Sequence, residues 1–176
     1  MKGHGEPVLY LDLDGVGHHE AVYISPKRGI YINQDEAPGR VLFEWIPILV
    51  DILRPHHDVK LVLSSSWCRR PGYDRTLKRL PDELRKRFVG GTFHRRHHGA
   101  DPLASREFQT LPRGQQILND VKRRQPSDWL ALDDDDEGWP ADHRGHLIHC
   151  NGSLGLSDPV TQVTLALRLA ALSRLG

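Results

Sequence analysis

Val8-Leu9-Tyr10-Leu11-Asp12-Leu13-Asp14-Gly15-Val16 carries the strongest signal in this 176-residue chain: four apolar residues lead directly into two aspartates and a glycine. A short, continuous apolar run predicts a buried strand of a parallel sheet. Alternate residues of a strand point to the same side, so the carboxylates of Asp12 and Asp14 should leave the strand end together. They would repel each other there, and a divalent cation such as Mg²⁺, which prefers oxygen ligands, would offset the repulsion. The stretch therefore predicts a metal site at the end of a buried strand.

Two further apolar runs predict strands, and each of them also ends in reactive side chains. Val59–Leu63 leads into three serines at 64–66, and Trp129–Leu132 leads into the acidic residues 133–137. Weaker strand patterns occur at Phe88–Phe93 and Leu147–His149, and helical patterns occur at Phe43–Leu53, Gly114–Arg124 and Asp158–Leu172. This alternation predicts an α/β fold with a three-layer, Rossmann-like parallel sheet, in which ligands bind beyond the carboxyl ends of the strands.

Two segments do not follow this alternation. In residues 17–40, two short β-type runs flank the loop 25–29, which predicts a β-hairpin placed to fold over the site as a flap. Residues 68–112 are interpreted as a basic, irregular insertion, with two short helices broken at Pro81 and a loop over His94–Ala104. No repeat or linker is evident, so residues 1–176 are expected to form one domain without a large cap.

Composition excludes several classes of protein. The chain is 38% hydrophobic and 27% charged, which is typical of a globular protein. No apolar run is long enough to span a bilayer and the N-terminus has no apolar signal core, so the cytoplasm is the expected location. Only two cysteines occur, Cys68 and Cys150, which argues against a disulfide framework and against a thiolate zinc site.

The net charge of +1 hides a strongly basic segment and a short acidic one. Residues 69–98 contain ten Lys or Arg and only three acidic residues, whereas residues 133–137 are all acidic. This asymmetry favours an anionic substrate together with a cation, and a nucleic-acid backbone is one candidate for the anion. A solvated basic helix face is the alternative interpretation of the basic segment.

Together these segments resemble the haloacid dehalogenase-like phosphohydrolase superfamily. The four motifs of that superfamily occur in order between residues 8 and 137: Asp-x-Asp at 12–14, a strand ending in serine at 59–66, Arg113 at a helix start, and an apolar strand ending in Asp133-Asp134. Ser-Ser-Trp at 65–67 and Arg-Gly-x-x-Ile at 113–117 look closest to a small-cap subgroup, which is similar to the phosphatase domains of nucleic-acid repair proteins. The resemblance implies a Mg²⁺-dependent phosphatase.

The resemblance also implies catalytic and metal-binding roles. Asp12 would be the nucleophile that forms an aspartyl-phosphate, and Asp14 would be the general acid and base, with its backbone carbonyl on the metal. Mg²⁺ would be held by Asp12, Asp14, Asp133 and Asp134, with Asp133 as the second carboxylate ligand. The pair His18-His19, just past the first motif, could reach a substrate through the flap.

The phosphoryl oxygens would be bound by Arg113 and by a serine hydroxyl, as the resemblance implies. Ser64 and Ser65 are the candidate serines, and the spacing to Trp67 favours Ser65. Arg113 stands where Lys is commoner in the superfamily, and a basic residue of 122–124 could take its place.

We therefore expect hydrolysis of a phosphomonoester, with a nucleotide, another phosphorylated small molecule or a nucleic-acid end as the substrate. A small cap would leave the site open to a bulky substrate such as a nucleic-acid end. The alternative is a catalytically silent binding module that keeps the fold and uses residues 69–98 to bind RNA or a protein. The intact aspartates argue against this alternative, because a site without chemistry has no reason to hold acids together.

Overall fold

The computed structural model describes residues 1–94, 98–99 and 101–173. Its centre is a five-stranded sheet with the order β5-β4-β1-β6-β7, in which all neighbouring strands are parallel. All five predicted strands are present, and the first of them lies in the middle of the sheet. The strands are β1 (Val8–Leu11), β4 (Lys60–Leu63), β5 (Phe88–Gly91), β6 (Trp129–Asp133) and β7 (Leu147–His149).

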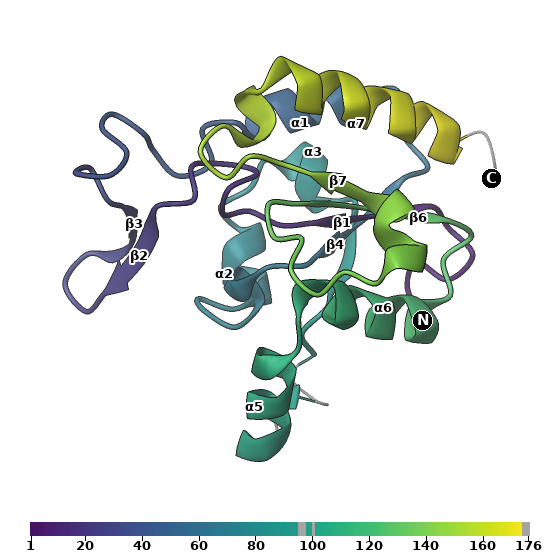
Figure 1. The fold of residues 1–176 in the computed structure, drawn as a ribbon, viewed down its shortest axis with the longest axis horizontal. Helices are drawn as coiled ribbons and strands as arrows, with labels where there is room; N and C mark the ends of the chain where they lie inside the picture. The colour runs from purple at the N-terminus through teal and green to yellow at the C-terminus, as the bar shows by residue number, and fades with distance from the viewer. Residues whose placement is uncertain (95–97, 100, 174–176) are drawn as a thin grey trace.

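Helices cover both faces of this sheet, which confirms the predicted three-layer α/β fold (Figure 1). The central strand β1 shows the physical reason. Leu9 and Leu11 pack into the apolar core under α1 and α7, whereas Val8 and Tyr10 pack into a second core against α6. Successive side chains of a strand point to opposite faces, so a strand covered on both faces is apolar throughout. The covering helices are α1 (Ile46–Leu53), α6 (Arg113–Arg124) and α7 (Pro159–Leu172).

Two helix starts show how local sequence sets the boundaries. α7 begins as predicted, because the Asp158 side chain accepts a hydrogen bond from the Val160 N–H and Pro159 occupies the first turn. α1 begins at Ile46 rather than at the predicted Phe43. Phe43 has a φ of 64°, which is in the left-handed region and incompatible with a right-handed helix.

Residues 68–112 are more regular than predicted. The break at Pro81 is confirmed, but the predicted loop over His94–Ala104 is wrong at its end, because a helix begins at Pro102. Asp101 caps this helix by accepting a hydrogen bond from the Leu103 N–H. Arg95, Arg96 and His97 of the basic segment lie outside the described residues. The elements after β4 are the short 3-10 helix η1 (Ser66–Cys68), α2 (Tyr73–Leu77), α3 (Asp82–Arg85) and α5 (Pro102–Thr110).

Two elements project from this core (Figure 1). The predicted hairpin is confirmed as the antiparallel pair β2 (Val22–Ser25) and β3 (Gly29–Ile32), and α5 projects in another direction. The described residues contain no large cap domain beside these two arms. Two further 3-10 helices, η2 (Ala141–His146) and η3 (Gly155–Ser157), connect β6, β7 and α7.

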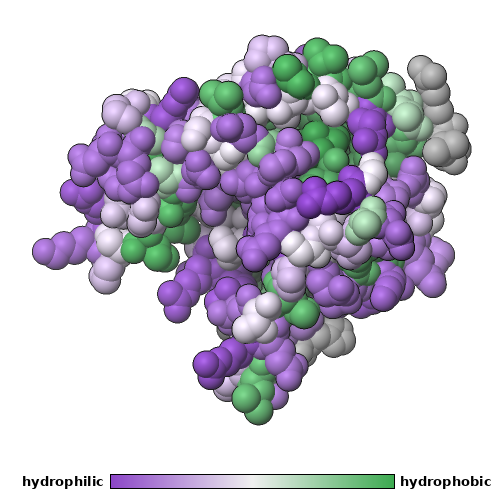
Figure 2. Space-filling view, viewed as in Figure 1, coloured by the Kyte–Doolittle hydropathy of each residue, from purple (hydrophilic) through white to green (hydrophobic). Residues whose placement is uncertain are grey.

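The face shown in Figure 2 is mostly hydrophilic, with apolar side chains gathered along α7 and on the hairpin. Val160, Val163 and Leu167 of α7 and Ile24 of β2 are among the exposed large apolar residues. None of the described helices has the length and hydropathy needed to cross a lipid bilayer.

Candidate active site

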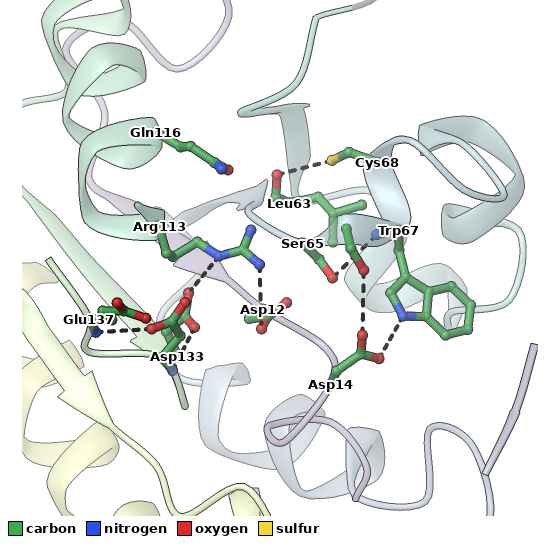
Figure 3. A network of polar contacts seen from close by, with 12 residues as sticks. Asp12, Asp14, Leu63, Ser65, Trp67, Cys68, Arg113, Gln116, Asp133 and Glu137 are labelled. Carbon is green, nitrogen blue, oxygen red and sulfur yellow. Dashed lines mark hydrogen bonds and ion pairs between the residues drawn. The ribbon is translucent and has the colours of Figure 1, made fainter. Parts of the chain in front are cut away.

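The candidate site lies at the carboxyl ends of three neighbouring strands (Figure 3). Asp12 follows β1, the serine run 64–66 follows β4, and Asp133 ends β6. Because β1 pairs in parallel with both β4 and β6, these three strand ends meet at one edge of the sheet. Arg113 reaches the same place from the first turn of α6. The motif residues therefore converge where parallel sheets usually bind ligands.

Three carboxylates form a compact group in this site. Asp12, Asp133 and Asp134 each offer one oxygen atom, and these oxygens lie within 4.8 Å of one another. Oδ1 of Asp12 and Oδ2 of Asp133 are buried without a hydrogen-bond partner. Buried carboxylate oxygens without hydrogen-bond donors are unfavourable, so the negative charge of this group is not fully compensated by the protein. It fits a hard cation that takes oxygen ligands, and the described residues contain no second such cluster.

The same burial shifts the pKa values of the group. Desolvation and the charge of Asp12 raise the pKa of Asp133 well above its usual range, and desolvation raises the pKa of Asp134 to about 7. Burial also raises the pKa of Asp12, although the positive charge of Arg113 opposes this shift. The carboxyls therefore hold protons more tightly than exposed acids do, and a bound divalent cation would displace those protons.

Arg113 is the cation that faces this group. Its Nε atom lies 3.5 Å from Oδ2 of Asp133, and a terminal nitrogen lies 4.0 Å from Oδ2 of Asp12. Burial lowers the pKa of Arg113, but the two carboxylates outweigh it and raise that pKa, so the guanidinium stays charged. Arg123 and Arg124, which the sequence leaves as alternatives, instead pair with Asp120 and lie at the other end of α6 from Arg113.

Asp14 points away from the three carboxylates. Its Oδ1 accepts a hydrogen bond from Nε1 of Trp67 at 2.7 Å (Figure 3). The same atom lies 3.0 Å from Nε2 of His18, and Oδ2 accepts a hydrogen bond from Ser66 Oγ at 3.5 Å. Trp67 and His18 are buried and stack edge to face, so they hold the carboxylate in one orientation. The hypothesis that His18-His19 reaches a substrate is wrong for His18, which is fully buried. His19 accepts a hydrogen bond from the backbone N–H of Ala21, just before β2.

The serines that follow β4 have different surroundings. Ser64 is fully buried, its hydroxyl has no hydrogen-bond partner, and it does not line the cavity of the site. Ser65 caps η1 by accepting a hydrogen bond from the Trp67 N–H, and its hydroxyl lowers the pKa of Asp12. Of the two serines predicted to bind phosphate, the structure brings Ser65 to the cavity wall and Ser64 into the core.

A cavity of about 380 Å³ opens beside Arg113 and Ser65. One wall is formed by residues 108–111, at the end of α5, and continues into the start of α6. Ser66, Arg69, Asp135 and Glu137 complete the lining. This volume lies in the range that holds a small-molecule ligand or one end of a larger one. The missed helix α5 therefore helps to shape the site.

Two glycines allow the acidic side chains to lie close together. A Cβ atom on Gly15 would be 2.0 Å from Oδ2 of Asp134, and one on Gly152 would be 2.8 Å from the same atom. The Gly152 position would also lie 2.3 Å from Oε2 of Glu20, an acid that sequence reasoning does not identify. Glu20 accepts a hydrogen bond from Ser153, and its charge contributes to the raised pKa of Asp134. No local pattern marks Glu20, because the fold alone brings it near Asp134.

A family model described as "HAD domain in Swiss Army Knife RNA repair proteins" matches residues 8–161. The chain belongs to this family. The resemblance to haloacid dehalogenase (HAD) proteins is therefore confirmed, and the five-stranded parallel sheet agrees with a Rossmann-like HAD core. Membership supports a HAD-type hydrolase role. Searches of curated proteins and of solved structures found no significant match.

Proposed function

We propose that this HAD-family protein is a Mg²⁺-dependent phosphatase that hydrolyses phosphomonoesters through an aspartyl-phosphate on Asp12. The observation that carries the proposal is the buried carboxylate group beside Arg113, in which oxygens of Asp12 and Asp133 lack donors. Such a group lowers folding stability, because a buried charge without full pairing is unfavourable. Phosphoryl transfer gives the group a use, since this reaction needs a nucleophile, a cation and a positive side chain at one point.

The proposed reaction has two steps. In the first, a carboxylate oxygen of Asp12 attacks phosphorus, the bond from phosphorus to the leaving oxygen breaks, and Asp14 donates a proton to that oxygen. In the second, water attacks the phosphorus of the aspartyl-phosphate and gives a proton to Asp14, which releases inorganic phosphate and restores Asp12. The contacts of Trp67 and His18 with Asp14 support this assignment, because a proton donor must be held in one position.

The remaining site residues would bind and orient the phosphoryl group. Arg113 and Ser65 line the cavity beside Asp12, where they would take phosphoryl oxygens as hydrogen-bond acceptors. Asp12, Asp133 and Asp134 would hold Mg²⁺, with the backbone carbonyl of Asp14 as the further ligand that the family resemblance implies. The bound cation would offset the repulsion between Asp12 and the anionic phosphoryl group.

We further propose that the substrate is a nucleotide or a nucleic-acid end. The family description names RNA repair proteins. Arg69 and Arg113 give the cavity a cationic lining, which suits a phosphorylated substrate. The described residues contain no large cap, so a bulky substrate has access to the cavity.

Release of inorganic phosphate from a substrate panel tests this function. The panel holds glycerol phosphate, nucleoside monophosphates and oligonucleotides phosphorylated at either end, each assayed with and without Mg²⁺. We expect Mg²⁺-dependent release, and we expect Asp12→Asn to lower it by several orders of magnitude, as loss of a nucleophile does. Asp136→Asn is the matched control, because Asp136 is a neighbouring acid that pairs with Arg144 at the surface. Absence of release from every substrate would show that the phosphatase proposal is wrong.

A further inference from the structure

A second hollow, of about 190 Å³, lies between the β2–β3 hairpin and η1. Ile24 and Ile30 of the hairpin line one side, and Arg69 and Arg70, which follow η1, line the other. Asp14 lines this hollow as well. The proposed phosphoryl ligands Arg113 and Ser65 do not line it; they line the larger cavity beside Arg113. The hollow therefore meets the site on the side of the proton donor.

This position relates the hollow to the leaving group of the proposed reaction. The nucleophile and the leaving oxygen lie on opposite sides of phosphorus in an in-line displacement. Asp14 must reach the leaving oxygen to protonate it, and Asp14 faces Trp67 rather than the carboxylate group around Asp12 (Figure 3). The group bonded to the leaving oxygen would therefore lie beside Asp14, in the smaller hollow. This step rests on the proposed phosphatase function.

The hairpin side of the hollow is apolar apart from Tyr23, whose hydroxyl donates a hydrogen bond to Glu36. Ile24 pairs directly with Ile30 across the two strands, and Val22 lies on the same face because it is two residues before Ile24. Ile24 is 58% exposed, so an apolar side chain is open to water at the hollow. A planar, weakly polar group packed against this wall would remove apolar surface from water, which is favourable.

The opposite side of the hollow is cationic. Arg69 and Arg70 are neighbours, and burial together with the charge of Arg70 lowers the pKa of Arg69. In the part of the chain that the structure describes, neither guanidinium forms an ion pair with a carboxylate. Arginine binds phosphate through its forked donors. Arg69 also lines a groove that contains Arg75 and Lys78, so positive charge continues away from the hollow.

We propose that this hollow binds the leaving nucleoside of a phosphorylated nucleic-acid end, and that Arg69 and Arg70 bind the next phosphate along the strand. The apolar wall suits the base and sugar of the nucleoside, and the two guanidiniums suit a second phosphate. A mononucleotide can occupy only the apolar wall, whereas a strand of two or more nucleotides can also place a phosphate at Arg69 and Arg70. Tyr73, in the groove beyond Arg69, offers an aromatic surface to a following base.

The test compares three substrates, using the full chain with Mg²⁺: glycerol phosphate, a nucleoside monophosphate, and a dinucleotide with the same terminal phosphate. Both 5′- and 3′-phosphorylated forms are assayed. We expect kcat/KM to rise from glycerol phosphate to the mononucleotide, and again from the mononucleotide to the dinucleotide. These rises should occur for the 5′-phosphorylated form, the 3′-phosphorylated form or both. Each rise should be at least roughly fivefold, the lower end of what one stacked base or one phosphate contact provides. Phosphotyrosine is assayed as a planar ester without a second phosphate.

Two variants separate the two contacts. Ile24→Asp should remove most of the rise between glycerol phosphate and the mononucleotide, and Arg70→Ala should remove most of the rise between the mononucleotide and the dinucleotide. Val41→Asp and Lys27→Ala are the matched controls, because they make the same kinds of change at positions outside the hollow. Ile24 and Arg70 are exposed, so the melting temperatures of their variants should stay near that of the wild type.

Three results would overturn the inference alone, and a fourth would overturn the proposed function with it. Equal kcat/KM for the three substrates would remove it and leave the phosphatase function standing. A higher kcat/KM for phosphotyrosine than for both nucleotides would assign the hollow to a different leaving group. Equal losses in the control variants would show that the hollow has no specific part in recognition. No hydrolysis of any substrate would overturn both the function and this inference.

Discussion

Among single residues, Gly15 is held to glycine by two separate constraints. Its φ of +69° disfavours any residue with a Cβ, and a Cβ there would lie 2.0 Å from Oδ2 of Asp134. We expect Gly15→Ala to displace Asp134 and to weaken Mg²⁺ binding by roughly tenfold or more, as disturbed ligand geometry does. Titration of the purified variant with Mg²⁺, followed by melting temperature, measures this change.

Gly29→Ala is the control for this prediction. Gly29 also has a φ of +69°, but no atom lies within 4 Å of the position of an added Cβ. Both variants should therefore show the backbone cost of about 1–2 kcal/mol for a left-handed residue. Only Gly15→Ala should lose Mg²⁺ affinity. Equal losses in the two variants would contradict the proposed place of Asp134 in the metal site.

Trp67 acts on the proposed reaction through Asp14. Its Nε1 atom donates a hydrogen bond of 2.7 Å to Asp14 Oδ1. We expect Trp67→Phe to lower kcat roughly tenfold or more for glycerol phosphate, with a smaller change in KM, because general acid catalysis contributes to the departure of a poor leaving group. The loss should be much smaller for p-nitrophenyl phosphate, whose leaving oxygen needs little protonation.

Trp45→Phe makes the same change in another buried tryptophan of the same apolar core, so it controls for lost packing. A loss with Trp67→Phe that is equal for both esters, or equal to that of Trp45→Phe, would contradict the positioning role of Trp67.

At the scale of elements, the strands could be predicted because each has its own local signal. β1, β4 and β6 are apolar runs, and a strand buried on both faces needs such a run. α5 starts with Asp101-Pro102, the same signal that predicts α7 at Asp158-Pro159. The apolar pattern of α5 is nevertheless too weak to predict a helix, since Phe108 is the one buried residue of α5. The start of α1 could not be predicted, because the positive φ of Phe43 has no sequence signal.

In the candidate site too, some features could be predicted from the sequence and others could not. Asp12, Asp133 and Arg113 could be predicted because each lies beside an element that the sequence marks. The contact of Asp14 with Trp67 could not, because Trp67 is 53 residues away and no pattern links the two. For the serines, the spacing to Trp67 favours Ser65 in the sequence, and the fold places Ser65 rather than Ser64 at the cavity.

Asp120 attaches α6 to the sheet and to the N-terminal segment. It accepts hydrogen bonds from the Tyr10 hydroxyl of β1 at 3.0 Å and from Nε of Arg124 at 2.7 Å, and Arg124 also donates to the carbonyl of Lys2. Asp120 and Arg124 are buried. We expect Asp120→Asn to lower the free energy of unfolding by about 3–5 kcal/mol, because it leaves a buried guanidinium without its partner. Denaturant unfolding at neutral pH measures this loss.

Asp82→Asn is the matched control for Asp120→Asn. Asp82 also pairs with an arginine three residues later, but at the surface, so its loss should cost less than about 1 kcal/mol. Similar losses in the two variants would contradict the structural role of Asp120.

For the whole molecule, the buried acids make stability depend on pH in a defined direction. The pKa of Asp134 is about 7 in the folded protein, and an unfolded chain has an aspartate pKa near 3.9. Between these values the folded state binds the extra proton, so the contribution of Asp134 to stability is fully present below about pH 4 and is lost as pH rises through about 7. Asp133 acts in the same direction. The hydrogen bonds of His94 and Arg124 outweigh burial and lower the pKa of Asp120. The contribution of Asp120 to folding stability is therefore fully present above about pH 4 and is lost at lower pH.

We therefore expect the melting temperature of the metal-free protein to fall between pH 5 and pH 7.5. Mg²⁺ should oppose this fall, because it binds the deprotonated carboxylates of the folded state. Asp134→Asn should raise the metal-free melting temperature at pH 7.5 and reduce the effect of Mg²⁺. Thermal unfolding with EDTA or with Mg²⁺ measures these changes. A metal-free melting temperature that rises over this pH range, or that Mg²⁺ leaves unchanged, would contradict the assignment.

The arrangement of the whole molecule agrees with a substrate that is larger than one phosphate ester. The cavity beside Arg113 is walled by the end of α5, and the hollow beside Asp14 is walled by the hairpin. Arg69 lines both spaces and so lies between the two arms. A substrate bound at Asp12 would therefore extend along Arg69, between α5 and the hairpin.

Mass spectrometry of an acid-quenched reaction tests the central claim most directly, because it locates the phosphoryl group on the protein. The wild type and Asp14→Asn would be mixed with Mg²⁺ and p-nitrophenyl phosphate, whose leaving oxygen needs little protonation, so that loss of the general acid does not block the first step. Each mixture would then be quenched with acid and digested. We expect a phosphoryl group on Asp12, with a larger amount in Asp14→Asn, which lacks the base for the second step. Asp12→Asn should carry none. Phosphate release without a phosphoryl group on Asp12, or phosphorylation of a different residue, would contradict the proposed mechanism.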